Sequence, residues 1–419
     1  SWGSESGLPI GSMLQAATGN DAMLYELAYE LEQAGFHPVI IEKQGTSGGR
    51  VQTITVEDFR LDLGFQVLLN AYPLAKKYLD LKALRLTKLE SGAQILVDGK
   101  RYVIGDPMRN WKVLLPTLFS GIGTIADKVN VLRLNFLLRK KSLDEIFNTP
   151  EVSTLDYLKV FGFSDTIISR FFKPFFAGIF LETELQTSSR MFEFVYKMFG
   201  EGYAMIPQDG IGAISAQLKA KLVQTTFKFN CEVESINSTT ITLKGGEKIP
   251  NQGAIVTSNA AALIPNLHDA QTKWKSCMCL YFEVNQTSIP DRTIALVADY
   301  GKLSNNLYAY KDHKGRTILS VTTLKHEGMG EEEIMETVKK EIQTYCGTGH
   351  VTHITNFRIK QALPNLENLK YTSEPSASLI AENIFIAGDT QFNGSLNAAM
   401  ESGRLAAAGL IEKKSGWFS

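Results

Sequence analysis

Cysteines, net charge and long apolar runs are all scarce in this sequence of 419 residues. Its four cysteines form no C-x-x-C pair, which argues against a disulfide framework and a zinc site and favours a reducing compartment. A formal net charge of −1 leaves no excess of Lys and Arg to neutralise a nucleic acid. No apolar run reaches the ~18 residues that a membrane-spanning helix needs. We therefore expect a cytoplasmic protein with no metal site, long enough for two domains.

The first residues, SWGSESGLPIGSM, have neither the basic start nor the apolar core of a secretory signal. Residues 1–12 resemble a tag or a flexible lead-in, which would make Met13 the first native residue. Only MLQAAT (13–18) then remains to form a first strand, and its strand pattern is weak.

A β-α-β unit is predicted to start with that strand. The pattern of residues 21–34 predicts a helix, and Gly35 lies where a helix C-cap belongs. HPVIIE (37–42) is apolar enough for a buried parallel strand and ends on Glu42. In a dinucleotide-binding fold, an acidic residue at that place accepts hydrogen bonds from the adenosine ribose hydroxyls.

The turn of this unit departs from the usual G-x-G-x-x-G, because its three glycine positions hold Gly19, Asp21 and Leu24. An Asp side chain at the second position repels a pyrophosphate, and Leu is bulky where the helix should pack closely on the strand. Three hypotheses stay open: a reshaped turn that retains the cofactor, which we favour; a non-catalytic relative that has lost it; or an unnatural sequence before Tyr25.

Two further segments have the composition of a cofactor site. GGRVQT (48–53) places two glycines, which allow close backbone approach, beside the charged fork of Arg50. IFIAGDTQFNGSLNAAMESGRLAA (384–407) is an apolar strand, a turn with Asp389, and a small-residue helix. The N-terminus of that helix offers unpaired N–H groups and a positive dipole end to an electron-rich ring edge.

Together, EKQGTSGGRVQT, FRLDLGFQVLL, PQDGIGAI and FIAGDTQFNGSLNAAMESGRLAA resemble the flavin-containing amine oxidase superfamily, which includes amine oxidases, protoporphyrinogen oxidase and carotenoid desaturases. The stretch 171–199 is most similar to members that resemble phytoene desaturase. The resemblance runs from about residue 24 to the C-terminal helix and implies FAD as cofactor.

The resemblance also implies which residues hold FAD. Glu42 would bind the adenosine ribose, Val233 the adenine through its backbone, Asp389 the ribityl–phosphate chain, and Leu396 with Asn397 the pyrimidine edge. The full predicted set is Gly19, Glu42, Gly48, Gly49, Arg50, Gly64, Phe65, Gln66, Val233, Gly388, Asp389, Ser395, Leu396 and Asn397. No acid–base constellation is evident, so no catalytic residue is predicted.

The expected fold is α/β: a Rossmann-like FAD-binding domain interleaved with an α+β substrate domain of a mixed sheet and a helical cap. We assign 13–75, 201–260 and 375–419 to the FAD-binding domain, and 76–200 with 261–374 to the substrate domain.

The expected reaction is removal of a hydride from a C–H bond of an apolar small-molecule substrate, such as a long polyene or related lipid, as in a desaturase. A flavin amine oxidase acting on a small amine is the alternative. Residues 111–141 mix apolar residues with a basic end, which two hypotheses explain. We weight a core-packing subdomain somewhat above helices that make peripheral contact with a membrane. The phenylalanines at 171, 172, 175, 176 and 180 are expected mainly to pack in the core, with a few lining an apolar tunnel.

Overall fold

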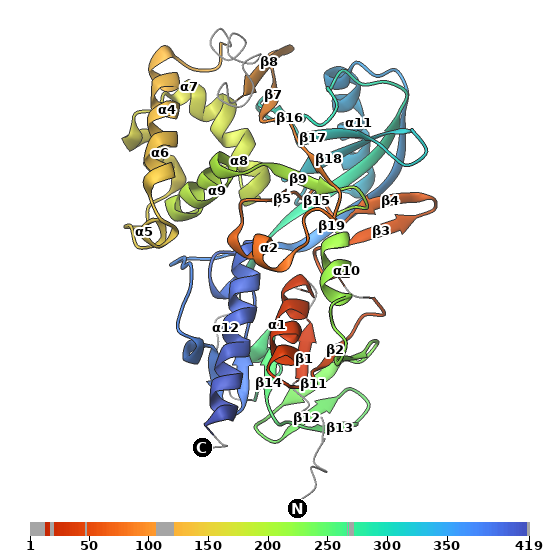
Figure 1. The fold of residues 1–419 in the computed structure, drawn as a ribbon. Helices are drawn as coiled ribbons and strands as arrows, with labels where there is room; N and C mark the ends of the chain where they lie inside the picture. Colours follow the sequence, from red (N-terminus) through yellow and green to blue (C-terminus); the bar gives the residue numbers. More distant parts are fainter. Residues whose placement is uncertain are drawn as a thin grey trace, which may run out of the picture.

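The computed structural model describes residues 13–16, 21–46, 48–105, 121–265, 267 and 272–416 (Figure 1). Figure 1 shows a lower part, in which two long helices lie against a parallel sheet, and an upper part, in which a large sheet stands beside a layer of helices. The predicted α/β class, with a mixed sheet and a helical cap, is confirmed.

The lower sheet has the strand order β10-β2-β1-β14-β21-β20, and every neighbouring pair except β21–β20 is parallel. β2 and β14 are apolar and largely buried, as parallel strands covered on both faces must be. The bounds are β1 (Met13–Ala16), β2 (Val39–Glu42), β10 (Thr226–Lys228), β14 (Ala254–Val256), β20 (Leu379–Ala381) and β21 (Ile384–Ile386).

The two faces of this sheet have different covers. Ile40 and Ile255 pack in the same core as α1 (Asp21–Gln33) and α12 (Leu396–Ser415). Their neighbours along the strands, Ile41 and Val256, point the other way because side chains alternate along a strand. They pack on a small antiparallel sheet of β11 (Val233–Ile236), β12 (Thr240–Leu243) and β13 (Lys248–Pro250).

The upper sheet has seven strands in the order β19-β15-β18-β17-β16-β7-β8, antiparallel except for the pair β16–β7. One face packs on α11 (Glu331–Cys346), and the other faces the rest of the molecule. The bounds are β7 (Gly92–Val97), β8 (Lys100–Gly105), β15 (Lys273–Val284), β16 (Ile294–Val297), β17 (Ser304–Lys311), β18 (Thr317–Thr323) and β19 (Val351–Asn365).

A layer of helices beside the upper sheet forms the cap. Phe172, Phe176 and Phe180 are fully buried there, whereas Phe171 and Phe175 are half-buried. The rings of Phe172 and Phe176 pack against Phe192, and the ring of Phe180 packs against Phe176. Core packing therefore accounts for the Phe-rich segment, and none of its five phenylalanines lines either of the cavities described below. The cap comprises α4 (Ile125–Lys140), α5 (Leu143–Phe147), α6 (Thr154–Phe161), α7 (Asp165–Ile167), a π-helix at Ile168–Phe172, α8 (Lys173–Phe180) and α9 (Ser189–Glu201).

Short elements join the two parts. They are β3 (Thr53–Val56) with β4 (Phe59–Asp62), the sheet of β5 (Leu68–Leu69), β9 (Ala204–Pro207) and β6 (Leu86–Lys88), and the helices α2 (Pro73–Tyr78) and α10 (Ala213–Lys219). Three 3₁₀ turns lie at Ala260–Ala262, Pro375–Ser378 and Asp389–Gln391. Among the described residues, no helix is both long and apolar enough to cross a membrane.

Candidate functional site

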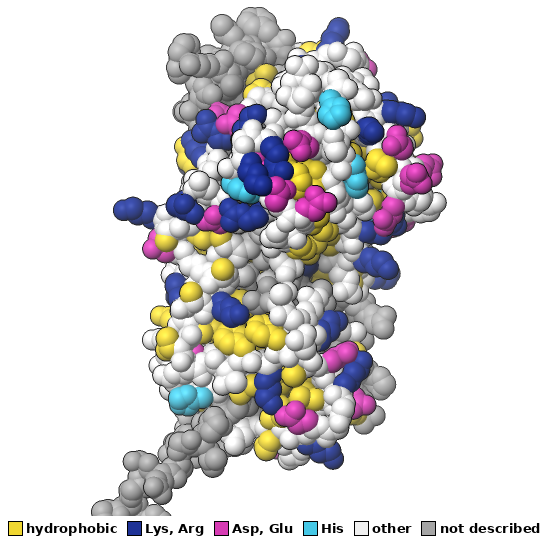
Figure 2. Space-filling model, turned by 90° about the vertical axis from the view of Figure 1, so that its right-hand side faces the viewer, with side chains coloured by type: hydrophobic (Ala, Val, Ile, Leu, Met, Phe, Trp, Pro, Cys, Tyr) yellow, Lys and Arg dark blue, Asp and Glu magenta, His cyan; other side chains and the backbone are white. Residues whose placement is uncertain are grey.

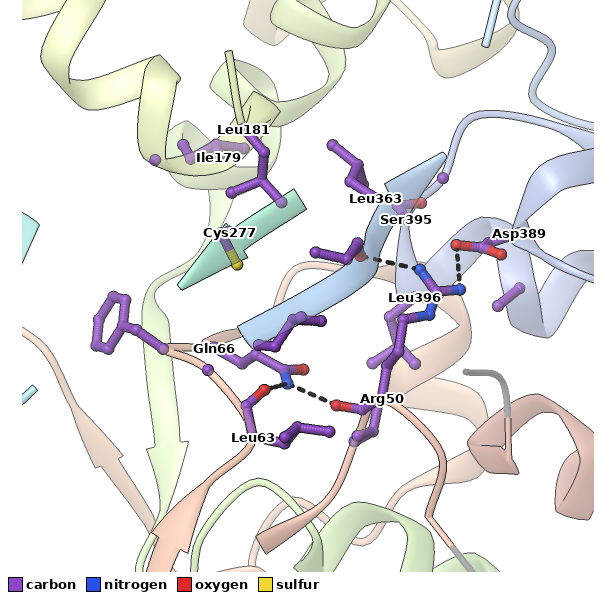
Figure 3. A pocket seen from close by; sticks show the side chains of 18 of the residues that line it. Arg50, Leu63, Gln66, Ile179, Leu181, Cys277, Leu363, Asp389, Ser395 and Leu396 are labelled. Atoms are coloured by element: carbon purple, nitrogen blue, oxygen red, sulfur yellow. Dashed lines mark hydrogen bonds and ion pairs between the residues drawn. The ribbon is translucent and has the colours of Figure 1, made fainter. Parts of the chain in front are cut away.

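Arg50 and Asp389, which are far apart in the sequence, meet between the two parts of the molecule (Figure 3). Arg50 Nη2 donates to Asp389 Oδ2 at 2.7 Å, and Nη1 donates to the carbonyl oxygen of Ala362 at 3.1 Å. Both side chains are largely buried, with 15% and 4% exposed, so the ion pair is shielded from water. The structure thus brings together two predicted cofactor residues from opposite ends of the chain.

The loop that carries Arg50 has the conformation that its glycines permit. Gly48 and Gly49 have φ of 131° and 53°, a region that other residues rarely adopt. The Gln66 side chain holds this loop from across the site, because Gln66 Nε2 donates to the Arg50 carbonyl at 2.6 Å and to that of Leu63 at 2.9 Å (Figure 3). Gln66 therefore fixes the backbone from which the guanidinium projects.

The N-terminus of α12 reaches the same place. Ser395 is its N-cap: its Oγ accepts from the Ala398 N–H at 3.0 Å and donates to Asn393 Oδ1 at 2.7 Å. Gly388 has a φ of 148°, and its N–H donates to Ser402 Oγ on α12 at 2.9 Å, which ties the turn before Asp389 to the helix. The helix end and the acidic turn therefore form one unit.

Asn397 has a role that the sequence did not predict. Its side chain is buried, and Oδ1 accepts from the backbone N–H of Leu74 at 3.1 Å, in the first turn of α2. Tyr72, the N-cap of α2, makes no such bond, so Asn397 stabilises that helix N-terminus from another element. Leu396, beside it, lines the cavity described next.

A cavity of about 240 Å³ lies between Arg50, the N-terminus of α12 and the upper sheet. Gly64 lies on its wall with a φ of 86°, a conformation that favours glycine, and a Cβ there would stand 2.8 Å from Ile359 Cδ1. Of the predicted cofactor residues, it is lined by Arg50, Gly64, Phe65, Gln66, Asp389, Ser395 and Leu396.

Glu42 and Val233 lie elsewhere. Glu42 is buried at the end of β2, where its side-chain Oε1 accepts a hydrogen bond from the Gln44 N–H at 2.8 Å. Its backbone carbonyl accepts a hydrogen bond from the Cys231 N–H at 3.0 Å. Val233 begins β11, and its side chain packs against Ile41 in the core. The structure thus joins β11 to the end of β2, as a shared adenosine site requires, but neither residue lines the cavity.

The altered glycine turn is only partly described. Gly19 lies outside the described residues. Leu24, at the third glycine position, is 1% exposed and packs in the core, so the bulk of its side chain is accommodated rather than clashing. Met23 lines the cavity.

The wall formed by the upper sheet and the end of α8 was not predicted. Its residues come from four elements or their ends, and only the tertiary fold brings them together. They are Gly178, Ile179, Leu181, Cys277, Thr322, Ile359, Ala362 and Leu363. The alternation in KSCMCLYFEV, which puts Cys277 and Cys279 on one face, was the available signal, but it does not say what that face lines.

This wall holds no titratable group that is ionised near neutral pH. Burial raises the pKa of the Cys277 thiol to about 12, so the thiol is neutral. Lys275, two residues earlier on β15, does not line the cavity, and its Nζ donates to Thr187 Oγ1 at 2.9 Å. Both cysteines of this strand are free thiols.

A second cavity of about 460 Å³ shares Phe65 and Gln66 with the first. Its aromatic lining comes from Tyr281, Tyr308 and Tyr310 of the same sheet face. Tyr308 stacks with Tyr310 at a centroid distance of 5.8 Å and contacts Phe65 at 5.2 Å. The two cavities thus meet at Phe65 and Gln66, which belong to the set of residues predicted to hold FAD.

The residues at the first cavity fit the flavin cofactor that the resemblance implies. A guanidinium held by Asp389 and the Ala362 carbonyl, a loop of positive-φ glycines, and the N-terminus of a 20-residue helix supply donors for an anion and for carbonyl oxygens. The other wall is apolar, as a ring needs. Among the described residues, no cluster of three His, Cys, Asp or Glu could hold a metal ion.

Solved structures share this fold at low identity. An oxidoreductase from Methanosarcina mazei is 15% identical, with a TM-score of 0.71 over 96% of this chain and 100% of that one. A protein assigned as a protoporphyrinogen oxidase from Exiguobacterium sp. 255-15 is 17% identical, with a TM-score of 0.69 over 96% and 99%. Cyclohexylamine oxidase from Brevibacterium oxydans IH-35A is 11% identical, with a TM-score of 0.67 over 97% and 100%.

No curated protein matches the sequence. The sequence model of one family, described as flavin containing amine oxidoreductase, matches residues 27–411. That match spans nearly all of the chain, including the GGR loop and the strand, turn and helix that carry Asp389. The chain belongs to the flavin-containing amine oxidoreductase family.

Proposed function

We propose that this FAD-dependent oxidoreductase removes a hydride from a C–H bond of an uncharged, apolar substrate. The observation that carries the proposal is the composition of the first cavity. Among the described residues, the charged side chains that line it are Arg50 and Asp389, which pair with each other. The wall formed by the upper sheet and the end of α8 presents aliphatic side chains, the neutral thiol of Cys277 and Thr322.

The chain's own residues bind the cofactor and orient the substrate. Arg50 and the N-terminus of α12 would hold FAD on one side, with Gln66 fixing the loop. Bound FAD would supply the two-electron acceptor for the hydride of one carbon, and the proton released from the neighbouring carbon as the double bond forms would pass to bulk water. Ile179, Leu181 and Leu363 exclude water from the reacting carbon (Figure 3).

No residue of this wall acts as a strong base. The Cys277 thiol stays protonated, and the Thr322 hydroxyl, whose buried Oγ1 has no hydrogen-bond partner among the described residues, is neutral. Thr322 is therefore a neutral lining residue that does not remove a proton from the substrate.

A small amine is the second candidate substrate, and the tyrosines of the second cavity favour it. Tyr281, Tyr308 and Tyr310 present aromatic surface, which attracts an ammonium group. The same cavity is lined by four cations, Arg60, Arg85, Arg292 and Lys311, and by four carboxylates, Asp62, Asp209, Asp291 and Asp312, so its charge does not select an ammonium group. We therefore place the apolar substrate first.

The two candidates are separated by two substitutions at Thr322. Thr322→Val keeps the shape and removes the hydroxyl, whereas Thr322→Asp places a carboxylate on the wall. Reduction of the flavin absorbance near ~450 nm would be followed without oxygen, with panels of apolar polyenes and of amines. For an apolar substrate we expect Thr322→Val to retain the rate and Thr322→Asp to lower it by roughly tenfold or more.

The reverse order, in which amines react and Thr322→Asp accelerates them, would overturn the proposal. Thr323→Val is the matched control, since Thr323 is buried on the opposite face of β18 and does not line the cavity. The FAD content of each variant shows whether the fold is retained.

A further inference from the structure

Exposed apolar side chains are concentrated on one helix of the cap. On α4, Ile125 is 81% exposed, Val129 59%, Leu132 57% and Phe136 58%. They stand at positions i, i+4, i+7 and i+11, which is the spacing of a single helix face. We call these four residues the α4 stripe.

The opposite face of α4 is fixed in the core, so the stripe cannot turn inward. Leu134 and Leu138 are fully buried. At the N-terminus, Asp127 caps the helix with Thr124 and accepts from Ser164 Oγ at 2.6 Å. At the C-terminus, Lys197 Nζ of α9 donates to the Leu138 carbonyl at 2.8 Å. Both ends of α4 are thus held by neighbouring elements.

The charges of α4 are all of one sign on its accessible surface. Asp127 is the helix's only acidic residue, and it is buried and hydrogen-bonded. Within the described part of the chain, no carboxylate forms an ion pair with Arg133, Arg139 or Lys140. Lys140 instead lies over the ring of Phe136, with Nζ 4.2 Å from the centroid.

A face of the molecule away from α4 carries a different distribution of charged and apolar side chains. Figure 2 views the side on the right of Figure 1, away from α4, where Lys and Arg alternate with Asp and Glu around small apolar areas. Such mixed charge is usual for a surface that faces water. The α4 stripe with its neighbouring cations therefore differs from this face.

We infer that α4 docks on the surface of a membrane that contains anionic lipids. Apolar side chains on one face with Lys and Arg beside them let a helix lie in the interface, with the stripe among the acyl chains and the cations at the headgroups. The inference is independent of which substrate the cavity takes.

A second copy of the chain is a poorer partner for the same surface. A two-fold contact would bring the stripes of both copies together and, with them, Arg133, Arg139 and Lys140 of each. Like charges brought together at an interface repel, whereas anionic headgroups attract all of them.

Vesicle sedimentation tests the inference with the full-length holoenzyme. We expect binding to vesicles of phosphatidylcholine with about 30% phosphatidylglycerol, and weaker binding to phosphatidylcholine alone. Leu132→Glu with Phe136→Glu should lower the affinity by roughly tenfold or more, because both side chains leave the acyl region. Arg133→Gln with Lys140→Gln should lower it by roughly tenfold, and only for the anionic vesicles.

The matched control is Val223→Glu with Tyr300→Glu, which adds the same charge at side chains that are 84% and 99% exposed outside α4. It should bind as the wild type does, and all variants should retain their FAD. No binding to either vesicle, or equal loss in the control, would overturn the inference. So would a dimer that the Leu132→Glu, Phe136→Glu variant dissociates while vesicle binding stays absent.

Discussion

Met23 of α1 lies so close to Gly403 of α12 that a Cβ on the glycine would stand 2.7 Å from Met23 Cγ and 3.2 Å from its carbonyl oxygen. The two helices that cover the lower sheet touch at this point, and Met23 also lines the cavity. The small residue in ESGRLAA is therefore needed for helix packing, next to the expected cofactor.

Gly403→Ala should force α1 and α12 apart. The added methyl group meets backbone as well as side chain, so we expect the free energy of unfolding to fall by about 1–3 kcal/mol. Urea unfolding would measure it. Gly200→Ala is the matched control on α9, because nothing lies within 4 Å of its Cβ position, and its higher helix propensity should leave stability equal or improved. Equal effects of both substitutions would contradict the packing argument.

Replacing Asp21 and Leu24 by the glycines of the usual motif should have different effects: the first on FAD affinity and the second on stability. Asp21 is the first residue of α1, and Asp21→Gly removes a negative charge from the helix end that should face a pyrophosphate, so FAD affinity should rise. Leu24→Gly empties a fully buried site within a helix and should cost about 3–5 kcal/mol of stability. FAD titration and thermal unfolding would measure the two effects. A stable Leu24→Gly variant with tighter FAD would show that Leu24 obstructs the cofactor.

Removing the charge of Arg50 should have two separable consequences. Arg50→Met removes the ion pair with the buried carboxylate of Asp389, so the cofactor-free protein should lose about 3–5 kcal/mol of stability. It should also weaken FAD binding by roughly tenfold or more. Adding Asp389→Asn should restore much of the stability but none of the affinity.

Arg50→Lys is the control, since it keeps a positive charge but not the planar fork of the guanidinium. Its FAD affinity should lie between those of the wild type and Arg50→Met. FAD per polypeptide, released by denaturation, is the readout. Full occupancy of Arg50→Met would contradict the assignment of Arg50 to the cofactor.

The sequence predicted those parts of the site that lie within one short segment. The GGR loop, and the strand, turn and helix around Asp389, each carry a local conformational pattern. The wall made by Cys277, Thr322 and Ile359 comes from three strands paired only in the tertiary fold, so no local pattern marks it.

In the cap, the sequence pattern also failed to predict which face of a helix is buried. α4 is apolar on both faces, so a period of 3.6 residues could not tell which face is buried. Likewise, the side-chain bond of Asn397 to the N-terminus of α2 joins residues from distant segments.

Glu26, on α1, gives a prediction about pH. It is fully buried, and neither carboxylate oxygen has a hydrogen-bond partner among the described residues, because the nearby Tyr78 hydroxyl donates to Glu30. Burial raises the pKa of Glu26 well above its ordinary value. The folded protein therefore holds this proton where the unfolded chain has released it.

The direction in which stability changes with pH follows from this difference in proton binding between the folded and unfolded states. The contribution of Glu26 to stability is fully present below the pKa of the unfolded chain, and it is lost as the pH rises towards the raised pKa of the folded state. Glu26→Met removes the ionisable group and fills similar space, so it should be more stable than the wild type by about 1–3 kcal/mol near pH 8. The advantage should shrink towards pH 4.

Urea unfolding of both proteins across this pH range measures the difference directly. Glu336→Met, on the exposed face of α11, is the control and should differ from the wild type by less than about 0.5 kcal/mol throughout. A constant gap between Glu26→Met and the wild type would mean that Glu26 does not change its protonation in this range. A gap that widens at acid pH would mean that Glu26 is ionised and paired in the folded protein, since only then does losing its charge cost stability.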